Sequence, residues 1–406
     1  MFTFPGATGE GRVITMPPPL DAESSAARLV CFGFDGFEMN SHCERMLDRG
    51  CGAVIIFARN IQSPKQVARL CASMKRRAHP RKLLIMVDQE GGRVARFGAP
   101  YFTSIPSARR VGESRDPVSA ASEIGDIIGG ECRAVNVDMT LAPVVDVNTN
   151  PHNEVIGDRA FGSRSKDVGQ IASAFIRGCQ AKGVAACAKH WPGHGDSNED
   201  SHDVLPTVRH SYERLRNIEI PPFQDAIAAG VASVLVAHLC VPGMENFRVN
   251  NSEKGAGERD GETNKNIPLA SCSKAVVGAL RDQLGFNGVA MSDDMEMGAL
   301  VNLPGGIGQA AVAGLHAGLD LFLVCHSEGK QNQVITALGD GIKNDCELKK
   351  KAMATETRLQ VLCSNFVDGA EAAERNVRAF DSDNNGVLGG REQQRRVEEA
   401  IGVSRL

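Results

Sequence analysis

Residues 185–191 read Ala-Ala-Cys-Ala-Lys-His-Trp, a short apolar run that ends in two basic residues and an aromatic one. Runs buried on both faces of a sheet have this nearly continuous apolar character. Seven similar runs recur along the chain, at Leu29–Phe34, Ala53–Phe57, Leu83–Asp88, Met139–Asp146, Val231–His238, Gly288–Asp294 and Leu319–Cys325. The sequence therefore predicts eight strands of a parallel sheet.

Helix-like stretches separate these runs, at Pro64–Arg77, Lys166–Lys182, Tyr212–Ala229, Ser273–Leu284 and Gly306–Ala317. Strands that alternate with helices pair in parallel through crossovers, and eight of them favour an α/β fold that closes as a (β/α)8 TIM-type barrel. The alternative is an open doubly wound sheet. That fold normally carries a glycine-rich phosphate-binding turn after an early strand, and we find none in this sequence.

Polar and ionisable side chains collect where the apolar runs stop on their C-terminal side. They are Asp88, Asp146, the pair Lys189 and His190, His238, and Asp293. In a parallel barrel the C-terminal ends of the strands form the face that carries the active site. We therefore expect these side chains to meet at one rim, although each alone is also compatible with the start of a loop.

The densest motif runs from Lys189 through Pro192-Gly193-His194-Gly195 to Asp200-Ser201-His202. A tight turn directly after a buried strand is followed here by a polar loop. In an extended segment Asp200 and His202 point the same way, and a carboxylate beside an imidazole fixes its tautomer and raises its basicity. This pairing suits general acid/base catalysis. A metal site is the alternative, but the spacing resembles no helix-borne zinc motif.

The second motif is Met291-Ser292-Asp293-Asp294-Met295-Glu296, in which two carboxylates close the seventh run. A carboxylate at a strand end in a confined site can act as the nucleophile on an anomeric carbon. The structural alternative is an N-cap for the next helix, which fits Asp294 better than Asp293.

With these motifs the sequence resembles glycoside hydrolase family 3, in particular its single-domain β-N-acetylglucosaminidase branch of the muropeptide-recycling type. The resemblance spans about residues 30–340 and rests on the stretches Asp88–Phe97, Leu141–Asn148, Gly157–Gly162, the KHWPGHG…DSH run and Ser292–Met295. Trp191 stands where this branch usually has Phe or Ile.

The resemblance implies a role for each matching residue. Asp293 matches the nucleophile that forms a covalent glycosyl-enzyme, His202 the acid/base, and Asp200 the carboxylate beside it. The positions that hold the terminal sugar are matched by Asp88, Arg96, Arg159, Lys189 and His190. A histidine acid/base departs from the usual two-carboxylate scheme, but an imidazole needs little pKa tuning to exchange protons near neutral pH.

The expected activity is therefore that of a retaining exo-β-N-acetylhexosaminidase acting on small glycosides or muropeptides, with no cofactor needed for catalysis. A β-glucosidase of the same family generally takes its acid/base from a second α/β domain, for which there is no room after residue 345. A phosphorylase, in which phosphate replaces water, stays open because the same loop would serve both reactions. So does a non-catalytic sugar-binding barrel, although Asp293 and His202 are both present.

Composition narrows the classes of partner. The formal net charge of −4 gives no footprint for nucleic acid or anionic membranes, and no run is long enough to span a membrane. The twelve cysteines show no paired spacing, which indicates reduced, mostly buried thiols. With no recognisable secretory signal, we expect a cytoplasmic protein; its oligomeric state is left open. Aromatic residues make up only 5% of the chain, which favours a small soluble substrate over a polymer that needs stacking platforms.

The domain organisation predicted is a catalytic barrel over residues 1–345, with a polar insertion at 245–266, and a helical C-terminal extension over 346–406. Within the extension, residues 381–392 fit the EF-hand loop pattern, with a glycine at the sharp turn. The Ca²⁺ ligands would be Asp381, Asp383, Asn385, Val387 and Glu392. Such hands usually pair and only one is visible, so a polar turn between two surface helices is the alternative reading.

Overall fold

Eight parallel strands close into a barrel within the residues that the computed structural model describes, which are 21–197, 206–245, 268–301, 305–382 and 387–402. The order around the barrel is β1-β10-β9-β8-β7-β6-β3-β2, and pairing of Val30 with Phe322 joins the first strand to the last. The strands are β1 Val30–Phe32, β2 Ala53–Ile56, β3 Leu84–Val87, β6 Met139–Thr140, β7 Ala185–Trp191, β8 Ser233–Val236, β9 Val289–Asp294 and β10 Leu321–Val324. All eight predicted strands and the barrel are confirmed.

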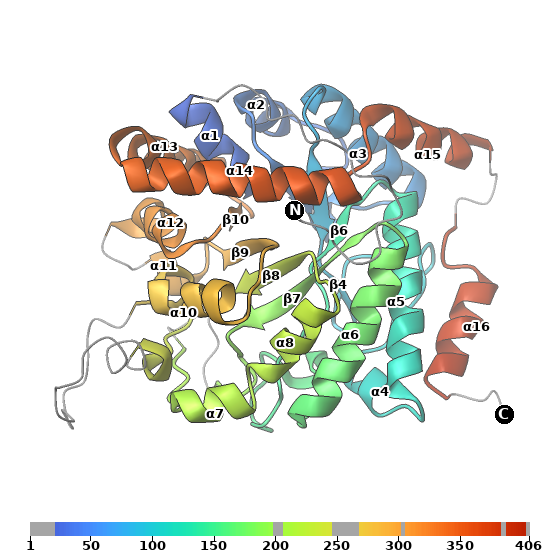
Figure 1. Ribbon diagram of the computed structural model, residues 1–406. Helices are drawn as coiled ribbons and strands as arrows, with labels where there is room; N and C mark the ends of the chain where they lie inside the picture. The colour runs from blue at the N-terminus through green and yellow to red at the C-terminus, as the bar shows by residue number, and fades with distance from the viewer. Residues whose placement is uncertain (1–20, 198–205, 246–267, 302–304, 383–386, 403–406) are drawn as a thin grey trace.

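Helices surround the barrel, as Figure 1 shows for α6 and α8 beside β7 and for α5 beside α6. Those that precede the last strand, β10, are α1 Ala22–Arg28, α2 Ser41–Arg49, α3 Pro64–Ala78, α4 Ala108–Gly112, α5 Pro117–Ala134, α6 Ser165–Ala181, α7 Tyr212–Asn217, α8 Pro221–Ala228, α10 Lys274–Gly278, α11 Gly298–Val301 and α12 Gly306–Ala317. They are followed by α13 Glu328–Asn344, α14 Cys346–Phe366, α15 Ala370–Ser382 and α16 Arg391–Ala400. None of the helices in the described ranges is long and apolar enough to cross a membrane.

Alternation along the strands explains why each run is apolar throughout. Along β3, Leu84 and Met86 point into the barrel, whereas Ile85 and Val87 belong to the core between the sheet and the helices. Successive side chains of a strand face opposite sides of the sheet. A strand in a barrel that is surrounded by helices therefore needs apolar residues both at the positions that face the interior and at those that face the helices. At the C-terminal ends, Ile55, Leu141 and Leu323 finish the interior stack and form the floor on which the site is built.

The helix α14 packs against the other end of the barrel. Its residues Leu359, Leu362 and Phe366 join the same buried cluster as the inward-facing side chains of the strands. The fully buried Asp320 accepts hydrogen bonds from Thr355 (2.8 Å) and Arg358 (2.9 Å) of this helix. The extension predicted to begin at residue 346 thus starts with a helix that packs on the barrel core.

The last two helices lie along the outside of the barrel helices, α15 beside α3 and α16 beside α5 (Figure 1). Arg396 of α16 pairs with Asp126 of α5 at 2.9 Å. Before α16, the backbone N–H groups of Leu388 and Gly389 donate to the carbonyl of Tyr101 at 2.8 and 2.9 Å. This segment is therefore attached to the loop that follows β3.

Proline accounts for two departures from the predicted elements. The fourth strand ends at Thr140 instead of Asp146, since Pro143 has no N–H to donate to a ladder. The helix expected over 212–229 is two helices, because Pro221 and Pro222 cannot continue α7 but suit the first turn of α8. The stretch predicted as one helix from Ser273 to Leu284 passes from α10 into a π-helical segment, η4 Ala279–Gln283.

Ten of the twelve cysteines are buried, which agrees with the prediction that most of the thiols are buried.

Candidate active site

A cavity of about 530 Å³ opens at the C-terminal ends of the strands. Its volume lies in the range of small-molecule sites. The polar residues that line it are Arg59, Asp88, Arg96, Arg159, Lys189, His190, His194, Asp293, Asp294 and His326. Of the rim residues predicted from the strand ends, Asp88, Lys189, His190 and Asp293 line this cavity together, whereas Asp146 and His238 are buried and are not among the lining residues.

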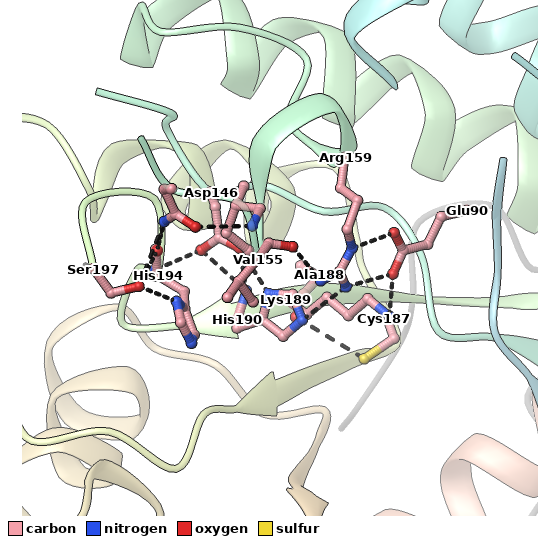
Figure 2. Close-up of polar contacts among 12 residues, drawn as sticks. Glu90, Asp146, Val155, Arg159, Cys187, Ala188, Lys189, His190, His194 and Ser197 are labelled. Carbon is pink, nitrogen blue, oxygen red and sulfur yellow. Dashed lines mark hydrogen bonds and ion pairs between the residues drawn. The ribbon is translucent and has the colours of Figure 1, made fainter. Parts of the chain in front are cut away.

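Glu90 is the centre of the charged network (Figure 2). Its carboxylate receives two hydrogen bonds of 2.8 Å from Arg159 and lies 2.6 Å from Nζ of Lys189. Burial alone would raise the pKa of Glu90, but the charges of Lys189 and Arg159 lower it to about 2. The ionised Glu90 therefore holds both cations at fixed positions in the cavity wall.

Asp88 connects this network to Arg96. It lies 3.1 Å from Nζ of Lys189 and 3.5 Å from Nη2 of Arg96. The short hairpin of β4 Gln89–Gly91 and β5 Val94–Ala95 brings Arg96 back over the end of β3. The Gln89 side chain fixes this return, because it accepts from the N–H of Arg96 (2.8 Å) and of Phe97 (2.9 Å).

His190 is oriented by Asp146. Its Nδ1 lies 2.7 Å from Oδ2 of Asp146, and its Nε2 lies 3.2 Å from Nη2 of Arg159. A guanidinium can only donate, so in the neutral ring Nε2 would accept from Arg159 and Nδ1 would donate to Asp146; the bond to Asp146 is available to the charged ring as well. Asp146 is fully buried and also accepts from the backbone N–H of His194 at 2.7 Å.

Asp293 lies near the end of β9, where its Oδ1 accepts from the N–H of Asp294 at 2.9 Å. Burial would raise the pKa of Asp293, but the imidazoles of His190 and His238, this N–H and the Lys189 ammonium outweigh it. Its pKa therefore falls below the ordinary value, and the carboxylate is ionised at neutral pH. This is the state that a nucleophile at a sugar carbon requires.

Asp294 has a different role. Its Oδ1 accepts from the N–H of Glu296 (3.1 Å) and of Cys325 (3.3 Å), so it closes the turn after β9 and ties it to β10. Its Oδ2 lies 3.4 Å from Nε2 of His326, and this contact raises the pKa of His326.

Sequence reasoning did not single out Arg59 and His326, which line the cavity on the side of β2 and β10. The His326 ring stacks on Phe57 with centroids 5.4 Å apart, and Cζ of Arg59 lies 4.4 Å from the centre of the Phe57 ring. His326 is the first residue after one apolar run, and Arg59 is the second residue after another. The rule that selects polar residues at strand ends would have found them if it had been extended by two positions.

Two buried histidines have one ring nitrogen without a hydrogen-bond partner among the described residues. His194 bonds Ser197 through Nδ1 (2.6 Å), and His238 bonds Ser271 through Nδ1 (2.7 Å), which leaves Nε2 of each unpaired there. Burial lowers the pKa of both rings.

Several of the predicted site residues lie outside the ranges that the structure describes. Asp200 and His202 lie outside the described residues, as does the predicted insertion apart from Glu245. In the EF-hand-like loop, Asp383 and Asn385 also lie outside them, and of Asp381 only the backbone is described. Val387 and Glu392 are exposed, and Glu392 pairs with Arg395 at 2.7 Å. Over the described ranges no cluster of three or more His, Cys, Asp or Glu side chains is arranged to hold a metal ion.

Comparison with known proteins gives consistent matches. The profile of the "Glycosyl hydrolase family 3 N terminal domain" matches residues 27–362. A β-hexosaminidase of Methylobacillus flagellatus is 35% identical over 292 residues, which are 71% of this chain and 77% of the relative.

Two solved structures extend the comparison. A glycoside hydrolase family 3 β-N-acetylglucosaminidase from Paenibacillus sp. str. FPU-7 superposes with a TM-score of 0.81 at 34% identity, over 94% of this chain and 68% of that one. NagZ from Neisseria gonorrhoeae, solved in complex with N-trifluoroacetyl-D-glucosamine, gives a TM-score of 0.70 at 28% identity over 93% and 98% of the two chains.

Proposed function

The chain belongs to glycosyl hydrolase family 3, and from this premise we propose that it is a retaining exo-β-N-acetylglucosaminidase with Asp293 as its nucleophile. It is a glycoside hydrolase, since relatives at this level of identity over most of the chain are β-hexosaminidases. The stereochemistry, the catalytic residues and the substrate are the parts that we infer.

The observation that carries the proposal is the ionised carboxylate of Asp293 in a wall of fixed positive charge. Lys189 and Arg159 are locked by Glu90, so their remaining N–H groups can donate to the hydroxyls of a sugar whose anomeric carbon faces Asp293. Donors that are already oriented cost little reorganisation during the reaction.

The proposed reaction has two displacements. In the first, an oxygen of Asp293 attacks C1 while the bond from C1 to the leaving oxygen breaks, and His202 as imidazolium protonates that oxygen. In the second, the now neutral His202 removes a proton from water, water attacks C1, and the bond to Asp293 breaks. Two inversions give net retention. Asp200 would orient His202 and stabilise its charged form.

The substrate that we propose is a terminal N-acetylglucosamine linked β to a small aglycone such as that of a muropeptide. The names of the relatives support the acetamido sugar, and a cavity of about 530 Å³ suits one sugar ring with part of its neighbour. The small aromatic content, 5% of the chain, supports a soluble substrate.

The test is release of nitrophenol from p-nitrophenyl N-acetyl-β-D-glucosaminide and from the matching glucoside, for the wild type, Asp293→Ala and His202→Ala. We expect turnover of the acetamido sugar, loss of activity in Asp293→Ala, and a larger effect of His202→Ala on poor leaving groups than on nitrophenol. Full activity of Asp293→Ala would overturn the assignment. A run with added phosphate, analysed for sugar 1-phosphate, separates a hydrolase from a phosphorylase, and an inactive wild type would indicate a sugar-binding barrel.

A further inference from the structure

His194 is a buried polar residue of the cavity wall that belongs neither to the charged network around Glu90 nor to the proposed reaction. Its side chain lines the cavity, yet the residue is only 3% exposed. Among the described residues its Nε2 has no hydrogen-bond partner. Burying a polar nitrogen without a partner is costly, so such an atom at a cavity wall points to a ligand.

The rest of His194 is fixed on all sides (Figure 2). Its N–H donates to Asp146 (2.7 Å), its carbonyl accepts from Asn153 (2.8 Å), and its Nδ1 lies 2.6 Å from Oγ of Ser197. The ring meets that of His190 edge-on, with centroids 5.9 Å apart and planes at 71°. These contacts leave Nε2 as the one ring nitrogen that can turn to a ligand without giving up a bond.

The chemistry of this nitrogen differs from that of its neighbours. Lys189, Arg159 and Asp88 are charged and paired, whereas burial lowers the pKa of His194 and keeps the ring neutral. A neutral imidazole nitrogen either donates or accepts one hydrogen bond. An amide offers both an N–H and a carbonyl. It can therefore hydrogen-bond Nε2 whether this nitrogen carries the proton or not.

The position next to His190 narrows the part of the substrate that His194 can reach. Among side chains, His190 has the largest effect on the pKa of Asp293, and His194 packs directly against His190. With Asp293 at C1, the group one bond away on the ring is the substituent at C2. Val155 also lines the cavity and can contact an acetyl methyl group.

We propose that Nε2 of His194 binds the C2 acetamido group of the terminal sugar and so selects N-acetylglucosaminides over glucosides. This inference rests on the proposed function and adds a specificity-determining residue to it. His194 takes no part in the bond-breaking steps.

Two amide substitutions separate a ligand contact from a structural role. In His194→Gln the side-chain amide nitrogen replaces Nε2, whereas in His194→Asn it replaces Nδ1 and keeps only the contact with Ser197. His194→Phe removes both nitrogens. His152→Gln is the matched control, because His152 is an exposed histidine and is not among the residues that line the cavity.

The measurement is kcat/KM for the p-nitrophenyl N-acetylglucosaminide and glucoside, with calorimetric Kd values for free N-acetylglucosamine and glucose. We expect His194→Asn and His194→Phe to lower kcat/KM for the acetamido sugar by about 10- to 100-fold, with the glucoside changed by less than about threefold. His194→Gln should restore most of the selectivity, and His152→Gln should match the wild type.

Equal losses on both sugars, or a His194→Asn variant as selective as His194→Gln, would overturn the inference. Failure of the wild type to hydrolyse either glycoside would instead count against the proposed function. In that case the Kd values still decide on the contact, since loss of N-acetylglucosamine binding in His194→Asn but not in His194→Gln supports it, and unchanged binding in both overturns it.

Discussion

The Nδ1 of His190 lies 2.7 Å from Oδ2 of Asp146, a carboxylate that is fully buried. Asp146 lies in the segment that follows β6, whereas His190 lies near the end of β7, 44 positions further along the chain. Asp146 also accepts from the backbone N–H of His194, so this one buried carboxylate positions both His190 and His194.

Asp146→Asn should therefore impair the site without a change at any residue that touches substrate. The amide cannot accept from all of the N–H groups that face Asp146, so the His190 ring loses its fixed orientation. We expect kcat/KM to fall by about 100-fold, the loss typical of a misplaced group. Steady-state measurement of kcat/KM for Asp146→Asn tests this prediction. The control is Asp158→Asn, which breaks an exposed ion pair with Arg93. Equal activity of the two variants would contradict the prediction.

Glu90→Gln should destabilise the fold most strongly at neutral pH. The folded-state pKa of Glu90 is lowered from 4.5 to about 2, so its contribution is fully present above pH 4.5 and is lost as pH falls toward 2. Removing the charge of Glu90 leaves Arg159 without its carboxylate partner and Lys189 with Asp88 as its remaining ion-pair partner among the described residues, and we expect a loss of about 3 kcal/mol at pH 7.

Urea unfolding followed by the fluorescence of Trp191, the single and fully buried tryptophan, measures this difference at several pH values. The gap between wild type and Glu90→Gln should narrow as the pH falls below 4.5. A gap that stays constant would show that the charge of Glu90 is not its source.

Glu131→Gln should have the opposite pH dependence. Burial raises the pKa of Glu131 from 4.5 to about 7, although its Oε1 accepts from the N–H (2.9 Å) and hydroxyl (2.6 Å) of Thr103. The stability that its protonated form contributes is present below pH 4.5 and is lost as pH rises through 7. The amide keeps the acceptor and never ionises, so the variant should equal the wild type near pH 4.5 and exceed it by about 2–3 kcal/mol at pH 8. The same urea titrations decide it, and a variant weaker at pH 8 would refute the prediction.

Calcium binding by residues 381–392 stays a prediction with a direct test. At a concentration a hundredfold above Kd, bound Ca²⁺ should stabilise the protein by about 2.7 kcal/mol and raise its Tm. Glu392→Gln should abolish both this shift and the heat in isothermal titration, because Glu392 would supply the bidentate ligand. Glu399→Gln is the control, since Glu399 pairs with the same Arg395 at 2.6 Å outside the loop. Absence of heat and of a Tm shift in the wild type would dispose of the site.

Much of this architecture could be predicted from the chain alone. Eight apolar runs predicted eight strands, since a strand that is buried on both faces is apolar at its odd and at its even positions. The residues that end those runs, among them Asp88, Lys189, His190 and Asp293, share one rim because parallel strands place their C-terminal ends together. Both inferences use only local patterns and the direction of the chain.

What the tertiary structure decided is how these groups are paired and charged. Glu90 lies 69 positions from Arg159 in the chain and 99 from Lys189, and no local pattern marks it as the anion between them. Nε2 of His194, which has no hydrogen-bond partner among the described residues, is likewise placed by the contacts with Ser197 and Asn153 and by the cavity. The ionisation of a carboxylate depends on its burial and on charged neighbours from other strands, and so does the availability of an imidazole nitrogen for a hydrogen bond. This burial and these neighbours exist only once the barrel has closed.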